Sequence, residues 1–201
     1  MYNVFVKFKS VRVIAGRDRG RKILYEESAA LRPTPDRVRE SLFNILQNDI
    51  PGAAVLDLFA GTGAFAFEAL SRGAAYAVIV DKNGDCVKNI KLNIEAFKIP
   101  ADKYRVLHSD YAYAVKTLAG QRFDAVFIDP PFEGGLYADC ADKLIGSGLI
   151  DDGGVIVIEA PADKELNLPE TAVVTDTRVY GTVKLVFVKR EMINDKRENE
   201  G

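Results

Sequence analysis

The sequence has few of the residues on which several common kinds of protein depend. It contains two cysteines, Cys86 and Cys140, and one histidine, His108, among 201 residues. Two cysteines are too few for a disulfide framework or a cysteine-based metal cluster. One histidine supports neither a histidine zinc site nor a Ser-His-Asp triad. We therefore expect no metal ion, and we expect a reducing, cytoplasmic setting.

Long hydrophobic runs are also missing. No apolar stretch approaches the roughly 20 residues that cross a bilayer. The opening MYNVFVKFKS lacks the apolar core and cleavage site of a signal peptide. With 48% hydrophobic and 28% charged residues, the composition is that of one globular domain. We expect no membrane association and a monomer.

Charge is spread unevenly along the chain. Residues 1–39 hold ten Lys and Arg residues against four acidic ones, a net charge of +6, and the remainder carries −8. A basic arm on an acidic body is typical of proteins that bind a polyanion, although scattered cations on a solvated hairpin would give the same count.

Two short β segments open the chain. VRVIA at 11–15 and RKILY at 21–25 have the composition of strands, and the intervening GRDRG favours a hairpin. The run LRPTPDRVRESLFNILQN then predicts a helix, with Thr34 as its N-cap and Pro35 at its first position.

From residue 53 onward, strand and helix patterns alternate. Helix-like segments separate five apolar strands, which indicates crossover helices and a parallel, doubly wound α/β sheet. Two further strands flank Gly181 and predict an antiparallel hairpin. The seven segments are 53–59, 74–81, 104–110, 122–129, 154–160, 171–180 and 182–190.

Gly61 and Gly63 lie in the loop after the first of these strands, where doubly wound sheets bind their ligands. GTGAFA also satisfies the dinucleotide pattern G-x-G-x-x-G/A, so the glycines alone do not select a ligand. Asp57 does select a ligand, because a carboxylate beside this loop repels a pyrophosphate and attracts an ammonium group. S-adenosylmethionine has an ammonium group and no phosphate, so we expect it as cofactor.

Acidic residues also end the next two strands. Asp81 follows Gly63 by eighteen residues, a spacing suited to a ribose diol. Asp110 is placed to reach an adenine amino group, with Tyr111 beside the ring. The expected cofactor-binding set is Asp57, Phe59, Gly61, Gly63, Asp81, Lys82, Asp110 and Tyr111.

The segment FDAVFIDPPF at 123–132 ends an apolar strand in a carboxylate and two prolines. The Asp129 carboxylate and the Pro130 carbonyl could accept both N–H bonds of an exocyclic amine and so free its lone pair. Pro131 holds the preceding residue extended, and Phe132 offers a face on which an extruded base can stack. Carbon methylation of pyrimidines usually needs a cysteine, and this loop has none. These four catalytic candidates therefore favour methyl transfer to an exocyclic amine.

These segments resemble the bacterial 16S rRNA guanine-N2 methyltransferases. The resemblance covers about residues 11–190 and includes VRVIAGRDRGRK, LRPTPDRVRESLFNIL, DLFAGTGAFAFEALSRGA, FDAVFIDPPF and YGTVKLVFVKR. LRPTPDRVRESLFNIL is its most specific part, since many methyltransferases share the glycine loop and the D-P-P-aromatic motif. The chain departs from the family at Phe132, where Tyr is usual, and in residues 1–10, which extend beyond the usual start.

The resemblance implies a Rossmann-like S-adenosylmethionine-dependent methyltransferase fold with a mostly parallel, seven-stranded sheet ending in an antiparallel hairpin. Together with the charge distribution and the polar end of the sequence, it divides the chain into a basic N-terminal β-hairpin arm (1–33), a methyltransferase domain (34–190) and a polar tail (191–201). The implied substrate is a guanine N2 in 16S rRNA or the small ribosomal subunit. Candidate RNA-binding residues are Arg12, Arg17, Arg19, Arg21, Lys22, Arg32 and Arg37.

Three other functions fit parts of the pattern. An adenine-N6 methyltransferase on DNA or another RNA shares the D-P-P-aromatic loop, although no insertion supplies a DNA-recognition domain. An NAD-binding oxidoreductase fits the glycines but not Asp57. An RNA-binding assembly factor without catalysis does not need the pair Asp57 and Asp129.

Overall fold

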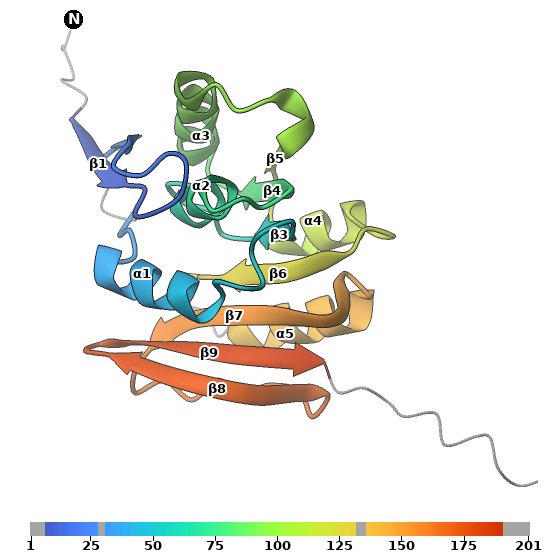
Figure 1. Cartoon of the computed structure of the whole chain (residues 1–201). Helices are drawn as coiled ribbons and strands as arrows, with labels where there is room; N and C mark the ends of the chain where they lie inside the picture. Colours follow the sequence, from blue (N-terminus) through green and yellow to red (C-terminus); the bar gives the residue numbers. More distant parts are fainter. Residues whose placement is uncertain (1–6, 28–30, 132–135, 191–201) are drawn as a thin grey trace, which may run out of the picture.

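The computed structural model of the chain describes residues 7–27, 31–131 and 136–190. Nine strands lie in these ranges: β1 (Phe8–Arg12), β2 (Lys22–Glu26), β3 (Ala54–Asp57), β4 (Tyr76–Asp81), β5 (Tyr104–His108), β6 (Phe123–Ile128), β7 (Ile150–Pro161), β8 (Ala172–Tyr180) and β9 (Val183–Arg190). Strands β1 and β2 form a separate antiparallel hairpin. The others form one sheet in the order β5-β4-β3-β6-β7-β9-β8 (Figure 1).

The large sheet is parallel from β5 to β7 and antiparallel at β9 and β8. The sequence patterns predicted this arrangement correctly, including the closing hairpin. Strand β6 lies beside β3, although β4 and β5 separate the two along the chain. This change in strand order is the topological switch point, where open α/β sheets bind ligands beyond the carboxyl ends of their strands.

Helices cover both faces of the sheet (Figure 1). Buried side chains of α1 (Asp36–Ile45), α2 (Ala64–Ser71) and α3 (Gly84–Phe97) pack on one face. Those of α4 (Tyr111–Thr117) and α5 (Leu136–Ser147) pack on the other. A short 3-10 helix, η1 (Ala101–Lys103), precedes β5. Because both faces are covered, the central strands β3, β4 and β6 consist mainly of buried apolar residues. No helix among the described residues is long and apolar enough to cross a membrane.

Alternation along the strands decides which side chains share the α1 face. Phe127 of β6 and Val157 of β7 belong to the core beneath α1, and Ile128 and Ile158 belong to the opposite core. Side chains two residues apart point to the same face. The residues that follow Phe127 and Val157 by two positions are acidic, so both carboxyls emerge on the α1 face.

The N-terminal hairpin is fixed to α2 by a buried carboxylate. Glu68 is fully buried, and its two carboxylate oxygens accept hydrogen bonds from the backbone N–H groups of Ile14 (2.6 Å) and Ala15 (3.0 Å). The amide of Asn93 in α3 exchanges two hydrogen bonds with the backbone of Leu24. The hairpin is thus hydrogen-bonded to two helices that also pack on the sheet.

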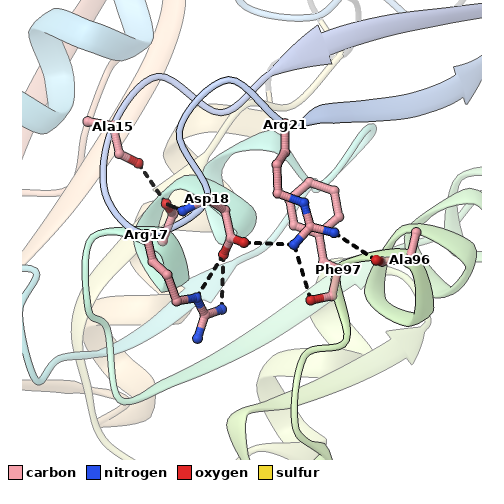
Figure 2. Close-up of polar contacts among 7 residues, drawn as sticks. Ala15, Arg17, Asp18, Arg21, Ala96 and Phe97 are labelled. Carbon is pink, nitrogen blue, oxygen red and sulfur yellow. Dashed lines mark hydrogen bonds and ion pairs between the residues drawn. The ribbon is translucent and has the colours of Figure 1, made fainter.

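Arg21 supplies a second attachment (Figure 2). Its guanidinium lies 3.9 Å from the centre of the Phe97 ring and donates to the backbone carbonyls of Ala96 (2.7 Å) and Phe97 (3.3 Å) at the end of α3. It also pairs with Asp18, which bonds Arg17 as well. A cation at a helix C-terminus is stabilised by the helix dipole.

The start of α1 differs from the sequence expectation. Pro35, not Thr34, occupies the N-cap position, and no side chain caps the helix. The Pro35 carbonyl accepts the first backbone bonds, from Val38 and Arg39. The prediction of Thr34 as N-cap was wrong because its hydroxyl donates instead to Glu159, 125 residues later in the chain.

We predict that Gly16→Ala destabilises the protein far more than Gly20→Ala. Both glycines have positive φ (82° and 83°), so either substitution carries the left-handed penalty of about 1–2 kcal/mol. A Cβ at Gly16 would lie 2.0 Å from the Ser71 carbonyl oxygen, whereas a Cβ at Gly20 meets nothing within 4 Å. Denaturant unfolding should show Gly16→Ala losing roughly 1–3 kcal/mol more. Equal losses would contradict the docking of this loop on α2.

Candidate functional site

Asp57 ends β3 as a buried carboxyl, with 2% of its surface exposed. The Ala66 N–H in the first turn of α2 donates to its Oδ2 at 3.3 Å. Burial raises the pKa of Asp57 to about 7; the Ala66 bond opposes this rise and the Asp81 carboxylate adds to it. A cation beside Asp57 would favour the ionised form, so the site suits a positively charged ligand.

The loop after β3 is held in place by Asp81. One carboxylate oxygen of Asp81 accepts the Gly61 N–H at 2.7 Å, and the other accepts the Asn83 N–H at 2.7 Å. Gly63 has a φ of 77° at the N-cap of α2, and a Cβ there would lie 3.0 Å from the Phe67 ring. Asp81 therefore positions the glycine loop, and it remains half-exposed at the end of β4.

The other expected cofactor residues follow along the same edge of the sheet. Asp110 caps α4 by accepting the Tyr113 N–H at 2.9 Å. The Tyr111 ring lies 5.5 Å from the Phe59 ring, and its hydroxyl donates to Asp139. This hydrogen bond is the largest cause that raises the pKa of Tyr111. Lys82 lies exposed beyond β4.

Asp129 directly follows β6 and lies, partly exposed, on the α1 side of the sheet. Its neighbour Pro130 is buried and Pro131 is exposed, whereas Phe132 lies outside the described residues. Burial raises the pKa of the Asp129 carboxyl well above its usual range, and the nearby Glu159 and Asp57 carboxylates raise it further. The two acids that sequence reasoning paired, Asp57 and Asp129, are thus close enough to affect each other.

Glu159 is a site residue that sequence reasoning missed. It is 5% exposed at the end of β7, and the register that pairs Ile128 with Ile158 places it beside Asp129. The Thr34 hydroxyl donates to its Oε2 at 2.8 Å. Burial raises the pKa of Glu159, while the Thr34 bond and the cationic Arg39 lower it. The signal was present in GVIVIEA, where an acid ends a buried strand as Asp129 does.

A small cavity separates these groups from the core. It has a volume of about 10 Å³, room for about one water molecule, and is lined by Asp129, Glu159 and apolar residues of α1, α2, β6, β7 and β9. A larger cavity of about 310 Å³ lies near Asp124 and Gly154, at the amino ends of β6 and β7. Ligands of parallel sheets bind at the carboxyl ends of the strands. The acidic residues at that end, around the smaller cavity, therefore form the candidate functional site.

Within residues 7–27, 31–131 and 136–190, no group of three or more His, Cys, Asp or Glu side chains is arranged to hold a metal ion.

The candidate RNA-binding cations fall into two groups. Three make ion pairs: Arg12 with Asp36 at 2.7 Å, and Arg17 and Arg21 with Asp18 at 2.9 and 2.8 Å. Four others make no ion pair with any residue that the structure describes; these are Arg19, Lys22, Arg32 and Arg37. All four are exposed, so their charge is available to a phosphate backbone.

Comparison with known proteins gives consistent matches over almost the whole chain. A family model described as "Conserved hypothetical protein 95" matches residues 11–189. Ribosomal RNA small subunit methyltransferase D of Haemophilus influenzae is 35% identical over 174 residues, 86% of this chain and 90% of that protein. Its namesake in Escherichia coli K12 is 36% identical over 182 residues, 90% of each. The solved structure of the yhhF protein of Escherichia coli aligns with a TM-score of 0.79 at 34% identity, covering 91% of this chain and 99% of that one.

We predict that Asp57→Asn stabilises the free protein increasingly as pH rises. The folded-state pKa of Asp57 is about 7 against an ordinary 3.8, so folding favours its protonated form, and this stability is lost as pH rises from about 4 through 7. Unfolding at about pH 4 and pH 8 should show the advantage of Asp57→Asn growing by on the order of 2–4 kcal/mol. Asp163→Asn, which makes the same change at an exposed position, is the control. An advantage that does not change with pH would contradict the burial of a protonated Asp57.

Proposed function

This chain belongs to the family of Ribosomal RNA small subunit methyltransferase D, and from that membership we propose that it methylates the exocyclic N2 of a guanine in 16S rRNA. The cofactor is S-adenosylmethionine. The substrate is the rRNA itself or a small ribosomal subunit.

One observation supports the proposal most strongly. Asp57 and Asp129 lie at the carboxyl ends of adjacent parallel strands, on either side of the topological switch point and next to the glycine loop. One acid binds the cationic methyl donor and the other orients the acceptor amine. The two acids must be neighbours for the methyl group to pass from the donor to the amine. Positioning of two reactants in this way accounts for much of the acceleration of a group transfer.

The residues at the site fit S-adenosylmethionine. Asp57, Asp129 and Glu159 place three carboxyls at one edge of the sheet, and a cluster of acidic groups favours a cationic ligand. When bound, the cofactor supplies an electrophilic methyl group on a positively charged sulfur. Asp57 and the loop at Gly61 would hold its methionine part, and Asp81 its ribose.

Asp129 and the Pro130 carbonyl orient the acceptor. Both accept N–H bonds from the exocyclic amine, which favours a pyramidal nitrogen with its lone pair directed at the methyl group. The acceptors are fixed before the reaction, because Pro130 is buried and Asp129 directly follows the central strand β6. Preorganised hydrogen bonds of this kind lower the barrier without a covalent intermediate.

The exposed cations of the N-terminal segment bind the RNA backbone. Arg19, Lys22, Arg32 and Arg37 are the first candidates because no acidic side chain of the described chain neutralises them. Arg12 and Arg17 are more than 60% exposed at the side chain despite their ion pairs, and they can add to the same surface. Such contacts position RNA without reading its sequence.

We predict that Asp129→Ala lowers the turnover number at least about 100-fold, while S-adenosylhomocysteine affinity stays within about threefold. The assay is transfer of labelled methyl groups to 16S rRNA transcribed in vitro, tested naked and after assembly into small subunits. Nucleoside mass spectrometry should find N2-methylguanosine. Label in N6-methyladenosine would replace the proposed target by the adenine alternative, and full activity of Asp129→Ala would remove the mechanism.

We further predict a difference between two kinds of basic residue. Combining Arg19→Ala and Lys22→Ala should weaken RNA binding and lower the steepness of its salt dependence by about 1 for each phosphate interaction removed, with little effect on stability. Arg21→Ala should instead lower the unfolding free energy by about 1–2 kcal/mol, because it removes the attachment to α3. Binding titrations across salt concentrations and denaturant unfolding separate the two effects. An unchanged salt slope in the double variant would exclude this surface.

A further inference from the structure

The mechanism above gives Glu159 no contact with the acceptor amine, yet its carboxyl lies beside Asp129. The two strands that carry them are hydrogen-bonded neighbours, with Phe127 opposite Val157 and Ile128 opposite Ile158. Both carboxyls line the same cavity of about 10 Å³. Like charges in a buried site of this size cannot both ionise at low cost.

The groups around the pair leave it with an excess of negative charge. Asp57 faces it from β3 and adds a third carboxyl. From α1, Arg39 contributes one buried cation, whose Nη2 is bonded to Asp36 and the Arg12 carbonyl and whose Nε and Nη1 have no partner in the described chain.

The remaining neighbours carry no charge of their own. Tyr137 of α5 adds a buried neutral hydroxyl, which also lacks a partner in the described chain. From β9, Leu185 lies opposite Glu159 and is apolar. Among the described residues, Arg39 is thus the cation that acts on this cluster, and it acts on Glu159.

Hydrogen bonds decide where a shared proton resides. Glu159 accepts the Thr34 hydroxyl at 2.8 Å and is acted on by Arg39, and both favour its ionised form. Within the part of the chain that the structure describes, no hydrogen bond to the Asp129 carboxyl is made. A proton held by the pair therefore lies mainly on Asp129, where it would block the carboxylate from accepting an N–H bond.

We propose that Glu159 is a positioning residue that shares one proton with Asp129 in the free protein, and that the pair releases this proton when a sulfonium ligand binds. The inference rests on the proposed function. Asp129 then becomes an acceptor for the substrate amine only when a methyl donor is present. Binding of the neutral thioether product leaves the proton in place.

The Asp129–Glu159 pair also takes up the proton that the amine loses during methyl transfer. During transfer the S–CH₃ bond breaks and the N–CH₃ bond forms, so the positive charge passes from sulfur to the amine nitrogen. One N–H bond then breaks, and an O–H bond forms on the Asp129–Glu159 pair. The pair returns to its singly protonated state, and the total charge of the site is unchanged throughout.

Calorimetric titration of the full chain with S-adenosylmethionine and with S-adenosylhomocysteine tests the inference without turnover. The two ligands share the ammonium, carboxylate and adenosine groups, so proton release caused by the ammonium group beside Asp57 is common to both. Titrations near pH 7 in buffers of different ionisation enthalpy count the protons released. We expect the sulfonium ligand to release up to about one proton more per site than the thioether.

Variants assign that difference to the pair. Glu159→Gln removes the neighbouring charge and Asp129→Asn removes the protonated acid, so each should abolish the difference between the ligands. Glu170→Gln makes the same chemical change at an exposed position and should keep it. Equal proton release by the two ligands in the wild type, or a full difference in Glu159→Gln, would overturn the inference. Failure of both ligands to bind would overturn the proposed function itself.

Discussion

The crowding of acidic groups at one edge of the sheet governs this molecule. Parallel strands β3, β6 and β7 bring Asp57, Asp129 and Glu159 to the same side, where burial raises the pKa of each carboxyl. Such a cluster destabilises the free protein, since folding must desolvate groups that prefer water. Two apolar cores on either side of the sheet offset that cost. A site that is unfavourable when empty is suited to a cationic ligand, which removes the electrostatic penalty on binding.

The N-terminal segment helps to build this site as well as carrying charge. Glu68 and Arg21 fix the hairpin to α2 and α3. The chain then passes over the cofactor loop, where the Leu31 side chain would lie 3.0 Å from a Cβ at Gly61. Thr34 reaches Glu159. One continuous stretch therefore joins the exposed cations proposed to bind RNA to the glycine loop and to the carboxyl pair.

Sequence reasoning predicted the parts of the structure that depend on local pattern. Apolar periodicity indicated the parallel strands and the closing hairpin. Asp57 and Asp129 could be identified because each is an acidic residue at the end of an apolar strand. It failed where a residue's role depends on a distant partner. Thr34 has the sequence context of an N-cap, and only the fold shows that its hydroxyl donates to Glu159. Arg39 is a charged residue of α1, yet it is fully buried and donates to the Arg12 carbonyl. Arg21 has the same local sequence context as its basic neighbours, and only the fold shows that its guanidinium lies over the Phe97 ring.

In the free protein, the site carries fewer negative charges than it has carboxyl groups, because burial favours their protonated forms. Carbon-13 NMR of Asp and Glu side-chain carboxyls, titrated across pH without ligand, measures this directly. Spectra of Asp57→Asn, Asp129→Asn and Glu159→Gln assign the three signals. We expect Asp57 to titrate with a pKa of about 7 and Asp129 with a pKa well above its usual range. Titration of all three near the ordinary value of about 4 would contradict it.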